Sequence, residues 1–445
     1  MSLLYNAKSL IRAFMPEWAV LLYHQTLADA GALWYRHPSR SMVVIGVTGT
    51  KGKTSVVHLI AHILMHAGKR AGFVTGVTIR VGDRTWPNTM KMTMPGRLKL
   101  QWLLREMAND GCEYAIVETT SEGIRQHRHR GIEYDVAVVT NVTPEHIESH
   151  GSFGAYLAAK GKLVAALAGS RKKVLKGVMI QKVKVLNKDD EHHQYFERFF
   201  SDMNAYFSTD ERQSDTATDY VARSIQVHDN GSVFRLRGTD CSLPMLGKHN
   251  VSNALCAMAV CETLGVPLQV VIEAIATSKP ASGRLEEIET GKKFRVFVDY
   301  AHEPASLRAL YEAIRLLRPK RLIAVLGSQG GGRDHAKRPV MGSIAAEFAN
   351  VVFITNEDPY DEDPKSIVDD VARGVLENTS KKFVEGNTLY KIVDRKAAIE
   401  TALSYAREGD VVCISGKGGE LIMAVAGGKN IPWDDRVVVR EWLKK

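Results

Sequence analysis

The chain has 445 residues, 45% of them hydrophobic, and a formal net charge of +9. This length exceeds one ordinary hydrophobic core and predicts two or three soluble globular domains. The basic residues are spread along the whole chain without a run of five or six like charges, which argues against nucleic-acid binding and favours an anionic small-molecule substrate such as a nucleotide.

Cysteine usage and hydropathy argue against a disulfide-stabilised secreted protein and against a membrane-spanning protein. Five cysteines without a Cys-x-x-Cys pair cannot all form disulfides and are typical of a reduced compartment. No apolar stretch reaches the roughly 18 to 20 residues that a membrane span needs, and the N-terminus lacks the pattern of a cleaved signal peptide. We therefore expect a cytoplasmic protein.

Residues 1–40 predict a short helical segment of one or two helices, interrupted at Pro16. We interpret this segment as a helical cap packed on the next domain. The alternative is a basic amphipathic segment that touches a membrane surface weakly. The apolar positions are not confined to one clean stripe, which favours the cap.

Strand-like and helical segments alternate from residue 41 to residue 280, in one predicted central domain. The first strand, residues 42–48, leads into a glycine-rich turn and a helix. The segments expected to follow are strands at Tyr114–Glu118 and Val136–Thr140 and a helix from about Phe153 to Leu167. This alternation predicts a doubly wound α/β domain.

In the second half of the chain, the alternation of strands and helices is interrupted once and then continues. Residues 205–245 are polar and β-branched and predict a small antiparallel excursion, after which residues 250–265 return to helix. Pro280–Gly283 is the expected linker to a second α/β domain, residues 281–445. Its predicted strands are Phe294–Asp299, Arg321–Gly327, Val351–Thr355 and Val411–Ser415.

The turn after the first strand has the composition of a phosphate-binding loop. Its sequence is Gly46-Val47-Thr48-Gly49-Thr50-Lys51-Gly52-Lys53-Thr54-Ser55. Glycines between a strand and a helix direct backbone N–H groups at anionic oxygens, and the helix dipole adds a favourable field. Lys53 is placed to reach the β- and γ-phosphates and the Thr54 hydroxyl to hold Mg²⁺, although the strict spacing would require Gly where Val47 stands. The loop predicts nucleoside triphosphate binding without naming the reaction.

Further motifs follow in the order found in the Mur ligase superfamily, which the chain resembles from residue 42 to about residue 435. They are Gly49 to Ser55, Val117 to Arg128, Thr140 to His146, Tyr156 to Lys160, Gly247 to Asn253, Gly283 to Glu286, Val298 to Pro304, Gly330 to Pro339 and Gly416 to Glu420. The resemblance implies an ATP-dependent amide ligase with a P-loop central domain, built on a mostly parallel doubly wound sheet, and a C-terminal Rossmann-like domain. The branch that adds the third peptide residue to a cell-wall precursor is the most similar.

Amide formation in water requires an activated carboxylate. Attack on the γ-phosphate gives an acyl phosphate, which the amine displaces, and charge neutralisation by Mg²⁺ and cations assists this transfer. Glu118, at the end of an apolar strand, is suited to bind Mg²⁺ through its hard oxygens. The resemblance implies that His146 is a second metal ligand and that Lys160 is carbamylated and also binds metal. From residue chemistry alone, Lys160 and Lys162 would look like a solvated helix face.

The resemblance also implies binding roles for other residues. The expected ATP contacts are Gly49, Thr50, Gly52, Lys53, Thr54, Ser55, Asn253, Arg284, Asp299 and His302. Arg333 and Lys337 are expected to supply positive charge to the phosphoryl oxygens, with an ordinary basic loop as the alternative. The expected contacts to the muramoyl-peptide acceptor are Thr93, Thr120, Gln126 and Arg128, and those to the amino acid are Asp358, Tyr360, Asp361, Gly416 and Glu420.

Three departures from the family pattern affect the substrates. Only about 40 residues precede the first strand, so the family's N-terminal domain for the uridine end has no counterpart here and the acceptor could carry another handle. Tyr360 stands where diaminopimelate-adding enzymes have an arginine clamp, and tyrosine cannot replace that bidentate cation. Asp358, Asp361 and Glu420 suit a cationic side chain such as lysine, with an acidic turn as the alternative. Gly419 replaces the family's histidine.

We therefore predict a monomeric Mur-type ligase that joins an amino acid to a muramoyl-peptide-like acceptor. One alternative is a ligase of the same fold acting on a poly-amino-acid, lipid-linked or pseudopeptidoglycan acceptor. A second is a non-catalytic nucleotide-binding partner subunit. The joint presence of Lys53, Glu118, His146 and Lys160 argues against the second.

Overall fold

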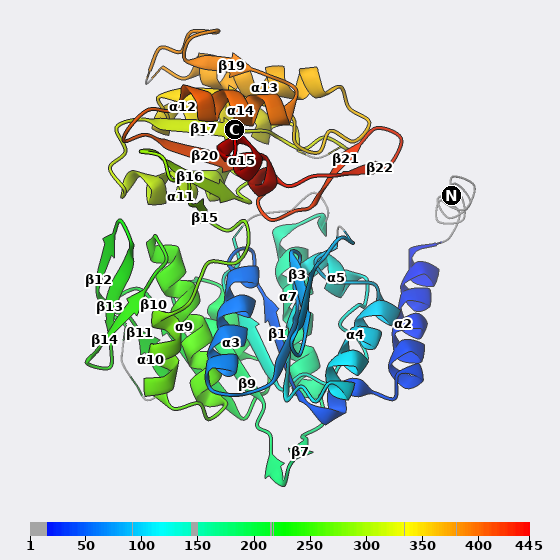
Figure 1. The fold of residues 1–445 in the computed structure, drawn as a ribbon. Helices are drawn as coiled ribbons and strands as arrows, with labels where there is room; N and C mark the ends of the chain where they lie inside the picture. The colour runs from blue at the N-terminus through cyan, green and yellow to red at the C-terminus, as the bar shows by residue number, and fades with distance from the viewer. Residues whose placement is uncertain are drawn as a thin grey trace. The chain divides into compact units, whose positions relative to one another are not determined.

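A computed structural model describes residues 16–143 except Lys91, and residues 150–445 except Ser214, Asp215, Ala217, Arg333 and Ser380. The predictions for residues 1–15, His146 and Arg333 lie outside the described residues. The chain divides into two compact units, with the main boundary between Ser278 and Lys279. Each unit is built around its own β-sheet flanked by helices (Figure 1).

Nine described strands form the sheet of the first unit, in the order β11-β10-β9-β6-β1-β5-β2-β3-β4. Their bounds are β1 (Val43–Thr48), β2 (Ala71–Val74), β3 (Thr78–Val81), β4 (Arg84–Pro87), β5 (Tyr114–Glu118), β6 (Val136–Val139), β9 (Val183–Asn187), β10 (Met203–Ser208) and β11 (Asp219–Val221). Within the described residues, the β2–β3 and β3–β4 pairings are antiparallel and the others are parallel.

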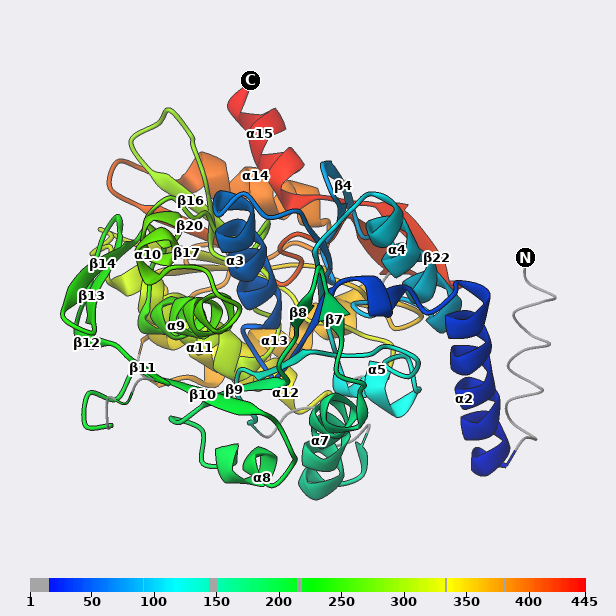
Figure 2. The ribbon, with the colours of Figure 1, turned by 90° about the horizontal axis from the view of Figure 1, so that it is seen from below.

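Helices cover both faces of this sheet, which is why strands such as β1 are buried along their whole length. The helices are α2 (Glu17–Trp34), α3 (Lys53–His66), α4 (Arg97–Asn109), α5 (Ser121–Arg125), α7 (Phe153–Gly169), α8 (His193–Glu197), α9 (Lys248–Thr263) and α10 (Leu268–Ala276), with a short 3₁₀ helix η1 at Pro38–Ser41. Helices α3 and α9 pack together on one face, and α4 and α7 share a core on the other (Figures 1 and 2). Helix α2 lies alongside α4, where Gly31 contacts Leu98.

The predicted antiparallel excursion at residues 205–245 is smaller than expected. Strands β10 and β11 take up its first part and extend the parallel sheet of the first unit. A separate sheet consists of β12 (Arg223–His228), β13 (Gly231–Leu236) and β14 (Thr239–Leu243). Connections of two residues join these neighbouring strands, and such short connections are possible only between antiparallel strands. Ala205 and Phe207 of β10 are buried, so packing against the helices overrides the polar composition of the segment.

Six described strands form the sheet of the second unit, in the order β15-β16-β20-β17-β18-β19. Their bounds are β15 (Glu286–Ile288), β16 (Arg295–Asp299), β17 (Leu322–Leu326), β18 (Val351–Ile354), β19 (Leu389–Lys391) and β20 (Val411–Ser415), and β15 alone among them is antiparallel. The helices are α11 (Pro304–Arg315), α12 (Lys337–Phe348), α13 (Pro364–Glu377), α14 (Arg395–Tyr405) and α15 (Asp435–Leu443). A hairpin of β21 (Ile422–Val425) and β22 (Lys429–Pro432) follows β20.

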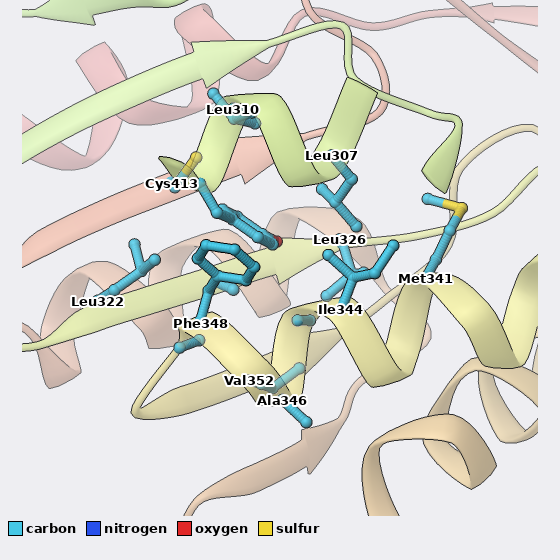
Figure 3. Packing of buried hydrophobic residues seen from close by; sticks show 14 of the residues in the cluster. Leu307, Leu310, Leu322, Leu326, Met341, Ile344, Ala346, Phe348, Val352 and Cys413 are labelled. Carbon is cyan, nitrogen blue, oxygen red and sulfur yellow. The ribbon is translucent and has the colours of Figure 1, made fainter. Parts of the chain in front are cut away.

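The core of the second unit lies on both faces of this sheet. On one face Leu307 of α11 and Met341 and Phe348 of α12 pack against Leu326 (Figure 3). On the other face α14 and α15 pack on the same strands. The two sheets and their helices confirm the predicted α/β fold class with a doubly wound P-loop domain and a Rossmann-like domain.

All five cysteines are buried and free: Cys112, Cys241, Cys256, Cys261 and Cys413. Among the described helices, none is long and apolar enough to cross a membrane.

Candidate active site

The phosphate-binding loop joins β1 to α3 at the carboxyl edge of the central sheet. Gly49 and Gly52 adopt φ angles of 151° and 82°. A Cβ on Gly49 would lie 1.9 Å from Thr140 Oγ1, and one on Gly52 would lie 2.3 Å from Asn253 Oδ1. Glycine is therefore required at both positions, and Thr140 and Asn253 support the loop from two sides.

The chain that follows β6 also holds the loop through hydrogen bonds. Asn141 Oδ1 accepts from Lys51 N at 2.9 Å, and the Asn141 carbonyl accepts from Thr50 N at 2.8 Å. Thr140 Oγ1 donates to the Lys51 carbonyl at 2.6 Å. Hydrogen bonds within the protein thus hold the loop in one conformation, which lowers the entropic cost of ordering it around a nucleotide.

The two side chains predicted to contact phosphate and metal lie in this loop. Lys53 Nζ donates to the carbonyls of Gly49 and Thr50, at 3.0 and 2.8 Å. Thr54 Oγ1 donates to Glu118 Oε2 at 2.9 Å, and Gly76 N donates to the same oxygen at 3.1 Å. Glu118 is almost fully buried at the end of β5, beside Val47 of β1. The hard oxygens of Thr54 and Glu118 suit Mg²⁺.

Lys160 reaches the same loop from α7 and is buried. Its Nζ donates to the Gly49 carbonyl at 2.8 Å and lies 4.3 Å from the centroid of the Tyr156 ring. The Tyr156 hydroxyl is 3.0 Å from Thr50 Oγ1. The reading of Lys160 as part of a solvated helix face is therefore wrong, and the structure brings Lys53, Glu118 and Lys160 to one loop.

The described residues contain no cluster of three or more His, Cys, Asp or Glu side chains arranged to hold a metal ion. Of the metal ligands that the family resemblance implies, Glu118 is the only one among the described residues that is a His, Cys, Asp or Glu.

One predicted acceptor-binding residue, Thr93, lies next to the loop that contacts Glu118. A Cβ on Gly76 would lie 3.0 Å from Thr93 Oγ1, so Thr93 contacts the glycine whose N–H binds Glu118. Thr120 caps α5 by accepting from Gly123 N at 3.1 Å. Both threonines therefore line loops at the carboxyl edge of the sheet, where ligands of open α/β sheets bind.

The side chains of Gln126 and Arg128, which follow α5, form a chain of hydrogen bonds that ends at Glu122. Arg128 Nη2 donates to Gln126 Oε1 at 2.7 Å, and Gln126 Nε2 donates to Glu122 Oε1 at 2.6 Å. Arg128 Nη1 donates to the Met94 carbonyl, next to Thr93. The structure thus brings three of the four predicted acceptor contacts, Thr93, Gln126 and Arg128, into one neighbourhood.

Arg97 belongs to this group and was missed from the sequence. It is the first residue of α4 and buried, and its Nε donates to the Gln126 carbonyl at 2.9 Å. Arg97 Nη2 and Arg128 Nε are buried without a hydrogen-bond partner among the described residues. Burial lowers the pKa of both guanidinium groups, and Arg128 lowers the pKa of Arg97 further. A cation at a helix N-terminus opposes the helix dipole, and this signal could have revealed Arg97.

In the second unit, the motif around Asp299 binds its own backbone. Asp299, at the end of β16, accepts from Leu285 N at 2.5 Å and from Ala301 N at 2.7 Å. Burial raises the pKa of Asp299, and Arg284 acts in the opposite direction. The Arg284 guanidinium lies 4.3 Å from the centroid of the Tyr300 ring. Asp299 therefore shapes the turn that presents Arg284.

His302 and Lys337 also lie together. His302 Nδ1 is 2.8 Å from the Tyr300 carbonyl. Lys337, the first residue of α12, donates through Nζ to the His302 carbonyl at 3.1 Å and to Glu303 Oε1 at 2.5 Å. The Lys337 ammonium is therefore buried and paired with Glu303.

The acidic residues predicted to bind the amino acid already have partners. Lys417 Nζ donates to Asp358 Oδ1 at 3.0 Å and to Glu420 Oε2, and Ala424 N donates to Asp358 Oδ1 at 2.7 Å. Asp361 Oδ1 accepts from Gly427 N at 2.7 Å, on the β21–β22 hairpin. Lys417 thus compensates two of the three carboxylates that were expected to attract a cationic substrate.

Glu357 is a second residue that sequence reasoning missed. Its side chain is fully buried, and both carboxyl oxygens lack a hydrogen-bond partner among the described residues. A Cβ on Gly416 would lie 2.3 Å from Glu357 Oε2, so the carboxyl group contacts the glycine predicted to bind substrate. Burial raises the pKa of Glu357 to about 7, although Arg395 and Lys417 act in the opposite direction. In the sequence, Glu357 is one of several acidic residues in a turn, and no sequence signal distinguishes it from Asp361 as a candidate for substrate binding.

Comparison with known families supports the arrangement of both units. The model of the Mur ligase middle domain matches residues 47–261, and that of the Mur ligase glutamate ligase domain matches residues 283–418. The chain belongs to the Mur ligase family. Mur ligases are ATP-dependent amide ligases, so the predicted enzyme class is confirmed.

Several relatives of this Mur ligase match almost the whole chain. A UDP-N-acetylmuramyl-tripeptide synthetase of Roseiflexus sp. (strain RS-1) is 37% identical over 94% of this chain and 81% of its own length. A UDP-N-acetylmuramoyl-L-alanyl-D-glutamate–2,6-diaminopimelate ligase of Geobacillus kaustophilus is 36% identical over 94% of this chain and 82% of its own.

Solved structures show the same fold. A UDP-N-acetylmuramoyl-L-alanyl-D-glutamate–2,6-diaminopimelate ligase is 28% identical, with a TM-score of 0.62 over 95% of this chain and 82% of that one. A folylpolyglutamate synthase of Mycobacterium tuberculosis solved with ADP is 19% identical, with a TM-score of 0.67 over 93% and 95% of the two chains, and is similar in fold alone.

Proposed function

We propose that this Mur ligase uses ATP in the cytoplasm to activate the carboxylate of a muramoyl-peptide acceptor and joins it to an amino acid. The observation that carries the proposal is the convergence of Lys53, Glu118 and Lys160 on one glycine-rich loop. An acceptor carboxylate oxygen attacks the γ-phosphorus, the bond to ADP breaks, and the amine then displaces phosphate from the acyl carbon with loss of a proton.

The loop supplies most of the charge that this transfer needs. Its backbone N–H groups and Lys53 bind the phosphate oxygens. Thr54, Glu118 and, through its proposed carbamate, Lys160 would hold Mg²⁺, which when bound would neutralise charge on the phosphoryl oxygens. The burial of Lys160 and the 2.8 Å hydrogen bond from its Nζ to the Gly49 carbonyl support the carbamate, because they place this amine in the loop that would hold the metal.

The acceptor is held through its anionic groups. Arg97 and Arg128 carry N–H groups that are buried without a hydrogen-bond partner among the described residues, and such groups gain most from a carboxylate or phosphate ligand. Thr93 is near enough to the metal carboxylate for the reacting end of the same acceptor to reach the phosphate loop. This anion could belong to a uridine-linked muramoyl peptide or to an acceptor with another handle.

The amino acid is proposed to have a cationic side chain, such as lysine. Because Lys417 compensates Asp358 and Glu420, we assign that cation to Glu357, whose carboxyl group contacts Gly416 and has no hydrogen-bond partner among the described residues. Tyr360 at the family's arginine position disfavours the distal carboxylate of diaminopimelate. Relatives such as the Geobacillus kaustophilus enzyme are nevertheless named for diaminopimelate, so both amino acids need to be compared.

Phosphate release from ATP tests the proposal. UDP-linked muramoyl dipeptide, and the same dipeptide without the uridine diphosphate, are each combined with lysine or diaminopimelate, and the products are identified by mass spectrometry. We expect release only when acceptor and amino acid are both present, with lysine preferred. No release with any pair contradicts the ligase proposal, and a preference for diaminopimelate contradicts the amino-acid assignment alone.

A further inference from the structure

A short hairpin extends from the edge of the first unit opposite the phosphate-binding loop. It consists of β7 (Val174–Leu175) and β8 (Val178–Met179), and in Figure 1 it projects below the sheet. Lys176 and Gly177 form the turn with φ angles of 51° and 79°, the conformation of a tight two-residue hairpin. The Ile180 N–H donates to the Lys173 carbonyl at 2.8 Å and continues the pairing to the base.

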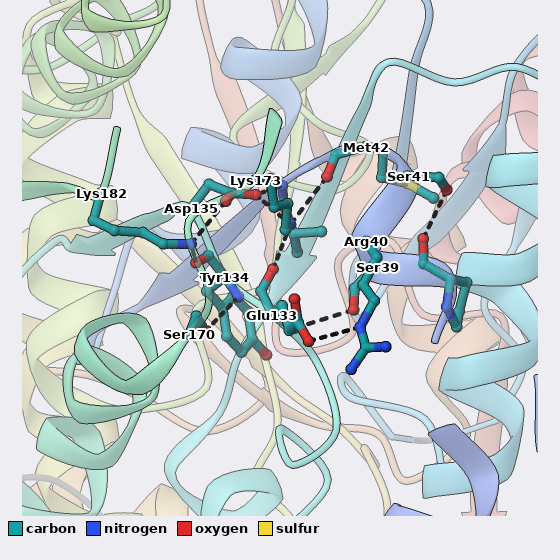
Figure 4. A network of polar contacts seen from close by, with 12 residues as sticks. Ser39, Arg40, Ser41, Met42, Glu133, Tyr134, Asp135, Ser170, Lys173 and Lys182 are labelled. Atoms are coloured by element: carbon teal, nitrogen blue, oxygen red, sulfur yellow. Dashed lines mark hydrogen bonds and ion pairs between the residues drawn. The ribbon is translucent and has the colours of Figure 1, made fainter. Parts of the chain in front are cut away.

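A buried group of charges fixes both ends of this hairpin. Lys173 enters it and Lys182 follows it, and their Nζ atoms donate to the two oxygens of Asp135 at 2.5 and 2.9 Å (Figure 4). Lys173 also donates to the Glu133 carbonyl at 2.7 Å, and Lys182 to the Tyr134 carbonyl at 2.7 Å. A buried triad of charges adds little net stability, but breaking one of its ion pairs leaves an uncompensated buried charge and is costly. We therefore infer that this triad holds the base of the hairpin in one geometry.

The end of this fixed hairpin is apolar and exposed. Val174, Val178 and Met179 are 63%, 62% and 63% exposed. Phe200, in the loop before β10, is also exposed, and its loop is tied to the hairpin segment by the ion pair between Lys172 and Asp202. Large apolar side chains gathered on a rigid projection mark a contact surface rather than a solvated turn.

Positive charge surrounds this apolar end. The segment from Arg171 to Lys184 contains six basic residues and no acidic one. Three of the six, Arg171, Lys172 and Lys176, are exposed beside the tip. Lys176 pairs with Glu113 and Lys172 with Asp202 at the surface, where such pairs contribute little and leave the cations available.

We propose that this hairpin docks the enzyme on the surface of an anionic lipid bilayer. Val174, Val178 and Met179 enter the boundary between headgroups and acyl chains, and Arg171, Lys172 and Lys176 contact lipid phosphates. A narrow apolar tip with exposed basic residues in the same short segment suits a fluid anionic surface, whereas a stable protein interface needs a broader complementary area. The phosphate-binding loop lies at the opposite edge of the same sheet, so the docked first unit keeps it directed away from the lipid.

Vesicle co-sedimentation of the purified full-length chain tests this surface. The probes are vesicles of phosphatidylcholine alone and of phosphatidylcholine with about one-third phosphatidylglycerol, at low and high salt. The tip variant is Val178→Asp/Met179→Asp. The matched control is Leu376→Asp/Val437→Asp, which changes two exposed apolar residues of α13 and α15. Phosphate release and thermal unfolding of each variant verify the fold.

We expect salt-sensitive binding to the anionic vesicles, weakened at least about tenfold in the tip variant and unchanged in the control. No binding of the unmodified chain to anionic vesicles overturns the proposal. Binding that survives the tip substitutions but is lost on deletion of residues 1–15 also overturns it, in favour of the N-terminal segment. A tip variant that dissociates an oligomer without any vesicle binding overturns it in favour of a protein interface.

Discussion

Replacing Glu357 by glutamine keeps the side-chain volume and removes a buried carboxyl group whose pKa is raised to about 7. A carboxyl group whose pKa is higher in the folded than in the unfolded chain favours folding while it is protonated. Stability is then greatest below the unfolded pKa near 4.5, falls as the pH rises to about 7, and is level above it. At 1.36 kcal/mol for each pKa unit, the loss amounts to roughly 3 kcal/mol.

Hydrogen exchange of the β18 amides, followed by mass spectrometry between pH 5 and pH 8, measures this change within the second unit. We expect the opening free energy of β18 to fall with pH in the unmodified chain and to lose that slope in Glu357→Gln. The exposed Glu377→Gln variant is the control. Equal slopes in Glu357→Gln and in the unmodified chain refute the assignment of a buried, titrating Glu357.

The same variant tests the role of Glu357 in binding the amino acid. If the ionised carboxylate binds a cationic side chain, the KM for lysine falls as the pH rises through 7. Loss of a charged hydrogen bond, about 1.5 to 3 kcal/mol, raises this KM in Glu357→Gln by roughly ten- to a hundredfold. A KM for lysine that stays constant with pH and is unchanged in the variant refutes this role, whatever the effect on stability.

Three other changes test the first unit. Arg97→Met is expected to raise the KM for the acceptor about tenfold or more with a smaller effect on kcat, whereas the exposed Arg84→Met is not; equal KM values in steady-state assays would argue against the anion site. Lys160→Ala is expected to lower kcat about a hundredfold, with partial rescue by short-chain carboxylates, while the exposed Lys162→Ala keeps its activity; full activity of Lys160→Ala contradicts the carbamate. Asp135→Asn leaves the buried ammonium groups of Lys173 and Lys182 without their counter-charge and is expected to lower the free energy of unfolding, measured in urea, by about 3 to 5 kcal/mol. A loss below about 1 kcal/mol contradicts the role of this triad of charges in fixing the base of the hairpin.

The central parallel strands β1, β5 and β6 were predictable because each is buried along nearly its whole length and therefore reads as a short apolar run. Residues 42–48, Tyr114–Glu118 and Val136–Thr140 correspond to β1, β5 and β6 almost residue for residue. Strands β3, β4 and β10 were not predicted, because their mixed composition acquires a burial pattern only from the helices and strands beside them.

The parts of the candidate site that consecutive residues define were predictable. The parts that depend on whether a charged side chain has an ion-pair partner were not. The order Gly49, Gly52, Lys53, Thr54 defines a loop by its own sequence. Whether a charge is compensated is decided by residues far along the chain. Lys417 lies beside Asp358 only after β20 and β18 enter the same sheet, and Glu357 is left without a hydrogen-bond partner among the described residues by the same folding. The sequence alone does not show which of these acidic residues has an ion-pair partner.

The five buried thiols give this enzyme a practical property for experiments. Burial raises the pKa of Cys241 to about 11 and also raises the pKa of Cys112, Cys256, Cys261 and Cys413, so thiolate is scarce and maleimide reagents react slowly with the native chain. A single cysteine introduced at the surface, for example Lys176→Cys in the hairpin turn, is then labelled selectively without removing any native thiol. A polarity-sensitive fluorophore at that position would report directly when the hairpin leaves water.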